Sequence, residues 1–255
     1  MKLILDIGNT AIKAGLFNGA HLVRASVFSD RSDLDSVIED FLLGEAVGST
    51  AFASVVPGER ERAVQALTRL TGVEPVEVGA ASALPITLSY LTPETLGADR
   101  IAAAVAAFML YGSDESGVPR PVIAVDAGTA LTIEVVTAGG DYLGGAIAPG
   151  PRLLSGSLHA GTAQLPEISL ELPDVAIGRS TTEAMQVGVM SGFAGAVERL
   201  LRGASECLDA TLVVIATGGW APFLLQEVSA VDIVAPHLVL DGIRLIADHA
   251  PGATG

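Results

Sequence analysis

The sequence predicts an α/β protein built from two similar halves, each with a mixed β-sheet flanked by helices. Strand-like and helix-like patterns alternate along the chain. A hairpin of one design occurs twice, in LILDIGNTAIKAGLF (3–17) and VIAVDAGTALTIEVV (122–136). A polar segment with glycine and proline, GSDESGVPR (112–120), separates the two copies. We therefore expect halves of residues 1–115 and 116–255, with a cleft between them.

The first half opens with a predicted β-meander and continues with alternating helices and strands. Apolar runs bounded by turn residues predict strands at 2–7, 11–17, 21–28 and 49–57. Apolar residues at helical spacing predict helices at 31–43, 58–72 and 96–112, the last rich in alanine. We expect Ser32 to cap the first of these helices and Gly72 to end the second. Asn18-Gly19 is a hairpin signal between the second and third strands.

The second half repeats this order of elements. Its first three strands are predicted at 121–128, 129–137 and 141–150, and a late strand at 211–219. Helices are predicted at 151–161, 181–203 and 239–250. The same succession in both halves indicates a duplicated architecture.

Composition and charge exclude several classes of protein. Hydrophobic residues make up 50% of the 255 positions and charged residues 17%, which favours a folded core over disorder. The net charge of −15 argues against non-specific binding to nucleic acid. The longest apolar run, 101–111, is shorter than the roughly 20 residues of a membrane span, and no basic-then-apolar targeting segment opens the chain. We expect a cytoplasmic protein with no membrane segment and no nucleic-acid partner.

The metal-binding residue types are sparse. The single cysteine, Cys207, excludes an intramolecular disulfide and a cysteine zinc site, and we interpret it as structural. The four histidines are scattered without ligand spacing. Any metal chemistry must therefore use oxygen ligands, which suit hard cations such as Mg²⁺ or K⁺.

The repeated hairpin carries the residue types of a phosphate site. Each copy has an Asp near the end of a buried strand, a Gly two residues later and then a Thr. Asp6 and Asp126 can hold a cation or its waters, and glycine lets a phosphate approach backbone donors. The alternative is an ordinary hairpin whose Asp accepts hydrogen bonds from turn amides. Two copies at equivalent places favour nucleotide binding, and the lack of a Gly-x-x-x-x-Gly-Lys-Ser/Thr loop excludes a P-loop kinase.

The two hairpins resemble those of the actin, hexokinase and Hsp70 superfamily, whose duplicated actin-like (ribonuclease H-like) two-domain fold is therefore expected. The chain is most similar to one family within it, type III pantothenate kinase. The segments that carry this resemblance, in the family's order, are 6–17, 90–100 (YLTPETLGADR), 126–136, 143–150 (LGGAIAPG), 162–166 (TAQLP), 177–188 and 217–219 (TGG). The resemblance implies ATP-dependent phosphorylation of pantothenate to 4′-phosphopantothenate, the first committed step towards coenzyme A.

The resemblance also implies an ATP site. The residues that match its phosphate loop are Asp6, Ile7, Gly8, Asn9, Thr10, Ala11, Ile12 and Lys13, and Thr129 matches a further ATP contact. Asp6 would act on Mg²⁺, directly or through water, and Asp126 matches the position that binds a monovalent cation, K⁺ or NH₄⁺. A solvated strand lysine is the alternative for Lys13. TGG resembles the adenosine-side loop, with a plain turn as the alternative.

A substrate site is implied in the same way. Asp99 occupies the family's general-base position, where it would accept the proton of the primary alcohol. The residues at pantothenate-binding positions are Tyr90, Gly97, Ala98, Asp99, Arg100 and Thr181. Arg100 can pair with the substrate carboxylate through its planar guanidinium. The alternatives are helix caps for Asp99 and Thr181, the latter with Ala184 at the third helical position, and a surface helix arginine for Arg100.

The family is dimeric, and some of its pantothenate contacts cross the interface, so a homodimer with a shared active site is implied. Two positions depart from the family pattern: Thr92, where Asn is frequent, and Glu134, where Asp is common. A kinase of the superfamily acting on another small molecule would leave 90–100 unexplained. A non-catalytic regulator would be expected to have lost one of the key aspartates, and a filament-forming actin relative to have a longer chain.

Overall fold

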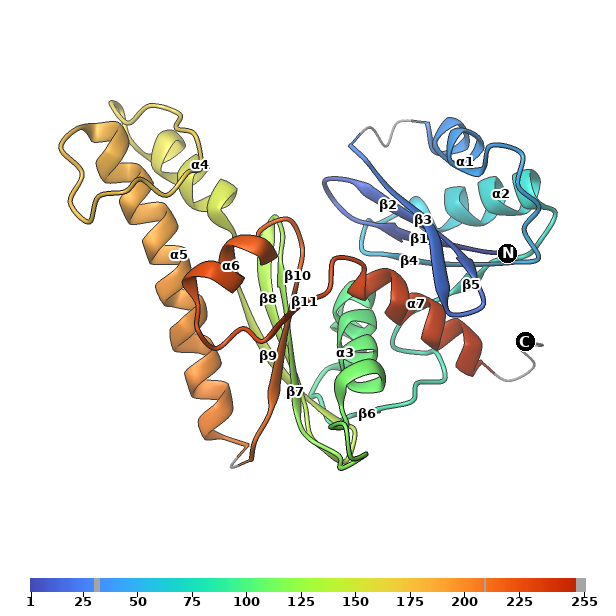
Figure 1. Ribbon diagram of the computed structural model, residues 1–255. Helices are drawn as coiled ribbons and strands as arrows, with labels where there is room; N and C mark the ends of the chain where they lie inside the picture. Colours follow the sequence, from blue (N-terminus) through green and yellow to red (C-terminus); the bar gives the residue numbers. More distant parts are fainter. Residues whose placement is uncertain (30–32, 209, 251–255) are drawn as a thin grey trace. The chain divides into compact units, whose positions relative to one another are not determined.

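The computed structural model describes residues 1–29, 33–208 and 210–250 (Figure 1). The chain divides into two compact units: Met1–Leu110 with Gly140–Tyr142 and His237–Gly255, and Tyr111–Gly139 with Leu143–Pro236. The expected halves met at 115/116, close to the first crossing. They differ from these units at the C-terminus, because the last helix packs on the sheet of the first unit.

Over the described residues, the sheet of the first unit has the order β3-β2-β1-β4-β5. Its strands are β1 (Lys2–Ile7), β2 (Ile12–Asn18), β3 (His21–Phe28), β4 (Ser49–Ser54) and β5 (Val76–Glu77). β1 is the central strand, antiparallel to β2 and parallel to β4. The predicted meander is therefore confirmed, and β5, which has two residues, was not predicted.

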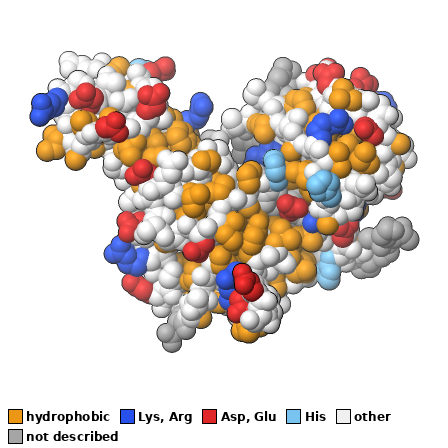
Figure 2. Space-filling view, viewed as in Figure 1, with side chains coloured by type: hydrophobic (Ala, Val, Ile, Leu, Met, Phe, Trp, Pro, Cys, Tyr) orange, Lys and Arg blue, Asp and Glu red, His pale blue; other side chains and the backbone are white. Residues whose placement is uncertain are grey.

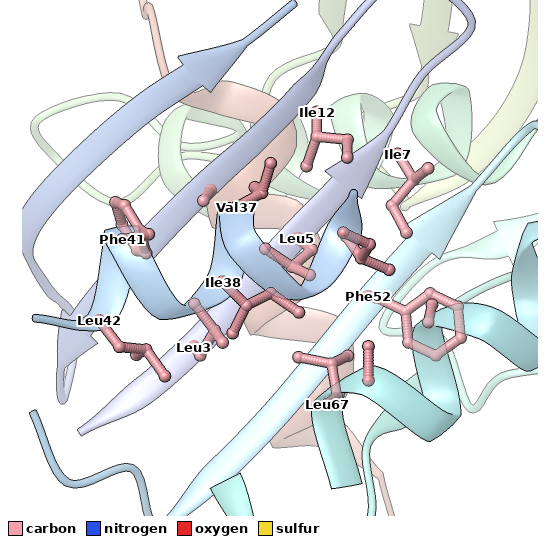
Figure 3. Close-up of a cluster of buried hydrophobic side chains, with 14 of the residues drawn as sticks. Leu3, Leu5, Ile7, Ile12, Val37, Ile38, Phe41, Leu42, Phe52 and Leu67 are labelled. Atoms are coloured by element: carbon pink, nitrogen blue, oxygen red, sulfur yellow. The ribbon is translucent and has the colours of Figure 1, made fainter. Parts of the chain in front are cut away.

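Helices cover both faces of this sheet. On one face, α1 (Leu34–Leu42) and α2 (Glu59–Thr71) bury Leu3, Leu5 and Ile7 of β1 in a common apolar cluster (Figure 3). On the other face, α7 (Leu238–His249) lies against β1 and β2, where Leu240 meets Gly15. The predicted cap Ser32 lies outside the described residues; the side chain of Asp33 accepts the amide of Ser36 at the start of α1.

The remaining elements of the first unit are β6 (Thr87–Leu88), a 3₁₀ turn, η1 (Pro93–Thr95), and then α3 (Ala98–Tyr111). Residues 100–107 of α3 are buried, whereas Met109 and Leu110 in its last turn are exposed. At Gly242, α7 meets α3 backbone to backbone, since a Cβ there would lie 1.9 Å from the carbonyl oxygen of Ala102. Only glycine allows this approach, so Gly242 fixes where α7 crosses α3.

The second sheet has the order β11-β10-β7-β8-β9-β6 over the described residues. Its other strands are β7 (Val122–Ala127), β8 (Ala130–Val136), β9 (Asp141–Pro149), β10 (Val213–Thr217) and β11 (Ile233–Val234). Alternate residues of β7 and β8 pack against α5 (Thr181–Glu206) and α6 (Ala221–Glu227), and α4 (Pro151–Gly161) packs on α5. The long elements match the predictions, whereas α6 and β11 were not predicted.

The central hairpins of the two sheets are built alike. β7 is antiparallel to β8 and parallel to β10, as β1 is to β2 and β4. Asp6 lies opposite Lys13 and Ala53, and Asp126 lies opposite Thr132 and Thr217. The sequence repeat thus corresponds to a structural repeat, and each aspartate lies near the end of a central strand. In the described part of the chain, no helix is long and apolar enough to cross a membrane.

Candidate active site

The β1–β2 turn holds a buried carboxylate beside a lysine. Asp6 is only 5% exposed, and its Oδ2 lies 3.3 Å from Nζ of Lys13, the residue opposite it in the hairpin. Both side chains belong to the sheet face that α7 covers, because they alternate with the residues packed on α1 and α2. A buried carboxylate needs a partner, and Lys13 supplies one. Lys13 is therefore a partly exposed lysine that is paired with a buried carboxylate, rather than a fully solvated one.

The turn itself leaves backbone accessible. The amide of Gly8 donates to the carbonyl of Ala11 over 3.0 Å, and Asn9 and Thr10 at its tip are exposed. A Cβ at Gly8 would lie 3.2 Å from the same carbonyl, a tight contact that glycine avoids. The turn therefore offers small, exposed groups next to Asp6, which is what a phosphate-binding loop requires.

In the second unit, two glycine-containing segments converge on the β7–β8 turn. The amide of Gly150 donates to the carbonyl of Thr129 over 3.1 Å, and the amide of Trp220 donates to that of Ala127 over 3.0 Å. Gly218 has φ of +87°, and a Cβ on it would lie 2.5 Å from Oδ1 of Asp126. The structure thus brings TGG (217–219) and Asp126 together, which the sequence had indicated only as separate motifs.

The groups around Asp126 fit a hard monovalent cation. Thr132 and the buried Thr217 lie opposite Asp126 on its two neighbouring strands, and Thr129 is exposed at the turn. Carboxylate, hydroxyl and carbonyl oxygens are the donors such cations prefer. A Cβ at position 218 would also lie 2.6 Å from the carbonyl oxygen of Ala127, so glycine there lets the TGG segment approach this carboxylate closely.

Asp99 lies in the first turn of α3, which begins one residue earlier, at Ala98. Its Oδ1 accepts the amide of Arg100 over 2.8 Å, and the carbonyl of Gly97 accepts the amide of Ile101 over 3.1 Å. The interpretation of Asp99 as the helix cap is therefore wrong by position. A Cβ at Gly97 would lie 2.5 Å from Oδ1 of Asp99, so glycine at 97 makes room for the carboxylate itself.

The other predicted substrate residues of the first unit are mostly enclosed. Arg100 is 9% exposed, so the alternative of a surface arginine is wrong. The ring of Tyr90 packs 5.8 Å from that of Tyr142, centroid to centroid. Thr92, one of the two departures from the family pattern, has its hydroxyl 2.9 Å from that of Thr95 and so supports the local 3₁₀ turn.

At the start of α5, Thr181 is the first helical residue and is exposed, but it is not the cap. Oγ of Ser180 accepts the amide of Glu183 over 3.2 Å, and Oε2 of Glu183 accepts the amide of Arg179 over 2.7 Å. The alternative of Thr181 as cap with Ala184 at the third position is wrong by one residue. Ser180 and Glu183 have the spacing of a capping box, a signal the sequence contains.

The second departure, Glu134, is fully buried. It lies on β8 opposite Ala124, two residues from Thr132, so it points to the same sheet face as Thr132 and Asp126. Sequence reasoning identified it only as a longer acid than the family's Asp. Its burial makes it part of the interior next to the Asp126 turn rather than a surface group.

Comparison with known proteins places this geometry in a family. A family model described as type III pantothenate kinase matches residues 2–203. The chain belongs to the type III pantothenate kinase family. Relatives of that name are 36% identical in Moorella thermoacetica, over 96% of this chain and 98% of that protein, and 38% identical in Streptomyces avermitilis, over 96% and 97%. The predicted family is confirmed, and with it the prediction of a phosphotransferase.

Solved structures agree on the fold. A ROK family glucokinase from Streptomyces griseus, solved with glucose and AMPPNP, has a TM-score of 0.55 at 14% identity, covering 98% of both chains. The activator of the 2-hydroxyisocaproyl-CoA dehydratase from Clostridium difficile has a TM-score of 0.54 at 13% identity, covering 97% of this chain and 95% of that one. At these identities the likeness shows the fold alone, and it confirms the predicted actin-like class.

Proposed function

We propose that this chain transfers the γ-phosphoryl group of ATP to the primary hydroxyl of pantothenate, giving 4′-phosphopantothenate for coenzyme A biosynthesis. The observation that carries this proposal is the family match over residues 2–203, supported by relatives that align over 96% of the chain. The enzyme would act in the cytoplasm, where ATP is available as its substrate.

The β1–β2 turn is proposed as the site of the ATP phosphates. The exposed residues after Gly8 allow close approach, and the buried carboxylate of Asp6 is the group that would hold Mg²⁺, directly or through water. Mg²⁺ bound with ATP would neutralise charge on the transferring phosphoryl group. Lys13 is placed to balance the charge of Asp6 and to bind a phosphate oxygen, since its Nζ is 3.3 Å from that carboxylate.

Asp99 is proposed as the general base. Its Oδ1 is held by the amide of Arg100, which leaves Oδ2 to accept the hydroxyl proton of pantothenate as the new phosphorus–oxygen bond forms and ADP leaves. The neighbouring Arg100 and Tyr90 would position the substrate, Arg100 by pairing with its carboxylate. Gly97 lets the carboxylate keep this position, since a Cβ there would collide with Oδ1.

Asp126 is proposed to hold K⁺ or NH₄⁺, together with oxygens of the β7–β8 turn. The support is the close approach of Gly218 to its carboxylate and the threonines on both neighbouring strands. The cation would screen negative charge of ATP, and Thr129 would contact the nucleotide.

A homodimer with a shared substrate site completes the proposal. Large apolar side chains are exposed on α4 and near it in the chain: Ile147, Leu153, Leu158, Val175 and Ile177, the last 79% exposed. Hydrophobic side chains are visible on the surface of this part of the second unit in Figure 2. Gathered apolar surface is characteristic of an interface. Thr181 follows this segment directly, so we propose that it reaches pantothenate bound in the partner.

The test is a coupled assay of ADP release with purified protein, ATP, Mg²⁺ and pantothenate, in K⁺, NH₄⁺ or Na⁺. Mass spectrometry of the product would verify 4′-phosphopantothenate. Turnover in K⁺ or NH₄⁺ but not in Na⁺ is the expected result. Absence of turnover with pantothenate in every salt, while ATP still binds, would reject the substrate assignment.

A further inference from the structure

The second unit contains a groove that the proposed reaction does not use. It has a volume of about 540 Å³ and lies between β8, β9 and the last turns of α5, which runs along this face of the sheet (Figure 1). Its lining is apolar side chains and glycine, with two exceptions, Arg199 and Cys207. An apolar pocket of this size with few polar groups is the usual form of a small-molecule site.

Glycines line the groove on both sides, Gly144 and Gly145 on β9 and Gly203 on α5. A Cβ at Gly145 of β9 would lie 1.6 Å from the carbonyl oxygen of Ile133, so this position cannot carry a side chain. Across the groove, a Cβ at Gly203 of α5 would lie 3.2 Å from Nη1 of Arg199. The guanidinium group therefore lies over the bare surface of Gly203, at the edge of the hollow.

Arg199 differs from the next arginine along the helix. Arg202 is 3.5 Å from Glu198 and forms an ion pair with it, whereas Arg199 is exposed and has no ion pair within the described residues. The exposed guanidinium group of Arg199 is therefore available to a ligand at the edge of this apolar groove. Its charge is complementary to an anion, and the floor of the groove is complementary to a hydrocarbon.

We propose that this groove binds a small amphiphilic anion, with its carboxylate or phosphate on Arg199 and an unbranched apolar tail running towards Cys207. The orientation follows from the helix. The C-terminal end of α5, at Glu206, carries partial negative charge that disfavours an anionic head near Cys207. The eight steps along the chain from Arg199 to Cys207 span about 12 Å along the axis, which leaves length for the tail. The proposal does not depend on the kinase reaction.

Cys207 provides a direct measurement, because it is the single cysteine, is exposed and lies in the wall of the groove. Its alkylation by iodoacetamide, which is uncharged, would be followed by mass spectrometry with decanoate, decyl phosphate, decanol or decylamine present below their aggregation limits. Decanoate and decyl phosphate are expected to slow alkylation saturably, about tenfold at ten times Kd, since only the unoccupied groove reacts. A difference between these two anions would identify carboxylate or phosphate as the preferred head.

Matched variants test two contacts separately: that of Arg199 with the anionic head of the ligand, and that of the apolar floor of the groove with its tail. The Kd of each variant is measured by calorimetry. Arg199→Met keeps the apolar stem and should weaken decanoate binding about tenfold, as expected for loss of a charge-assisted pair. Gly203→Leu should fill the groove and abolish binding. Arg202→Met, on the same helix and with its own ion pair, should bind like the parent protein. Circular dichroism and urea unfolding would establish that each variant is folded.

Three results would overturn the proposal. Decanol or decylamine protecting Cys207 as well as decanoate would remove the role of the anionic head. An unchanged Kd in Arg199→Met would remove the role of the guanidinium group. Protection of Cys207 that rises with protein concentration, without any added compound, would show that a second copy of the chain covers the groove.

Discussion

Asp6 and Lys13 face each other across the first hairpin, with Oδ2 of the aspartate 3.3 Å from Nζ of the lysine. The side chain of the aspartate is 7% exposed and that of the lysine 35%, so the pair is buried on one side and open to solvent on the other. The same two groups therefore contribute to folding and stand at the proposed phosphate site.

Removing one member of this pair should cost stability as well as activity. Lys13→Met leaves the carboxylate of Asp6 buried without its cation, which should lower the unfolding free energy by about 1–2 kcal/mol, less than for a fully buried pair because Lys13 is partly exposed. The double variant Asp6→Asn/Lys13→Met should recover stability in urea unfolding while staying inactive. Recovery of both properties would contradict the proposed role of Asp6.

Asp99→Asn should leave the fold intact and reduce kcat by about 10²–10⁴, the usual contribution of a general base. Steady-state kinetics with ATP and pantothenate would measure it, with the binding of ATP checked by calorimetry. Glu94→Gln is the matched control, because Glu94 is an exposed carboxylate in the same segment. A kcat within a few-fold of the parent enzyme for Asp99→Asn would argue against this base.

Gly218→Ala should disturb the proposed cation site. The new Cβ would lie 2.5 Å from Oδ1 of Asp126 at a backbone φ of +87°, so both the carboxylate and the turn must shift. We expect the K⁺ concentration for half-maximal rate to rise about tenfold or more, which corresponds to roughly 1.4 kcal/mol. Gly219→Ala, where a Cβ meets nothing within 4 Å, is the control. If both variants needed the same K⁺ concentration for half-maximal rate, Gly218 would have no role at the cation site.

Gly242→Ala should destabilise the first unit by about 3 kcal/mol, since its Cβ would be 1.9 Å from the carbonyl oxygen of Ala102 and the two helices must separate. Ala102 is one turn after Asp99, so kcat should fall as well. The control is Gly188→Ala in α5, where a Cβ meets nothing and helix propensity predicts a gain of up to about 1 kcal/mol. Urea unfolding would compare the unfolding free energies of the two variants. Equal values would exclude a tight crossing of α7 and α3 at Gly242.

The pH dependence of stability should include a contribution from Asp241. Burial raises the pKa of this carboxyl above its ordinary 3.8, against the opposing effect of Arg244, whose Nη2 is 3.4 Å away. A raised acid pKa means that the folded state holds the proton more tightly. The stabilising effect of this tighter proton binding is complete below the ordinary pKa of the carboxyl, and it is lost as the pH rises through the folded-state pKa. Relative to Asp241→Asn, the parent protein should therefore lose unfolding free energy over that range in urea titrations; the opposite slope would contradict the burial effect.

Elements with a long repeating pattern could be predicted from the sequence, because local periodicity determines which face is buried. Both hairpins, α3, α5 and α7 were found in this way. The short strands could not be found, since Thr87 and Leu88 become a strand only by pairing with Asp141 and Tyr142, far away in the chain. The sequence also could not show to which unit α7 belongs, because that depends on which sheet the helix covers.

The candidate site was predictable where chemistry follows spacing within one segment, as in the two aspartate hairpins. What the sequence could not show is why particular glycines are needed. Gly150 and Gly218 approach the β7–β8 turn from distant segments, and Gly242 meets another helix. Each requirement arises from the approach of two backbones, which leaves no local pattern. The cap at Ser180, by contrast, could have been identified from its spacing to Glu183.

Because α7 belongs to the first unit, that unit can complete its fold only after α7 has been synthesised. The strands that leave the ribosome first carry Asp6 and Lys13 on a sheet face that α7 later covers. The second unit is nearly continuous in the chain and can form before that helix is translated. Until α7 has been synthesised, the face of β1 and β2 on which this helix packs stays uncovered. A ribosome that stalls before Leu238 releases a chain whose first unit lacks this cover, a natural substrate for chaperones and proteases.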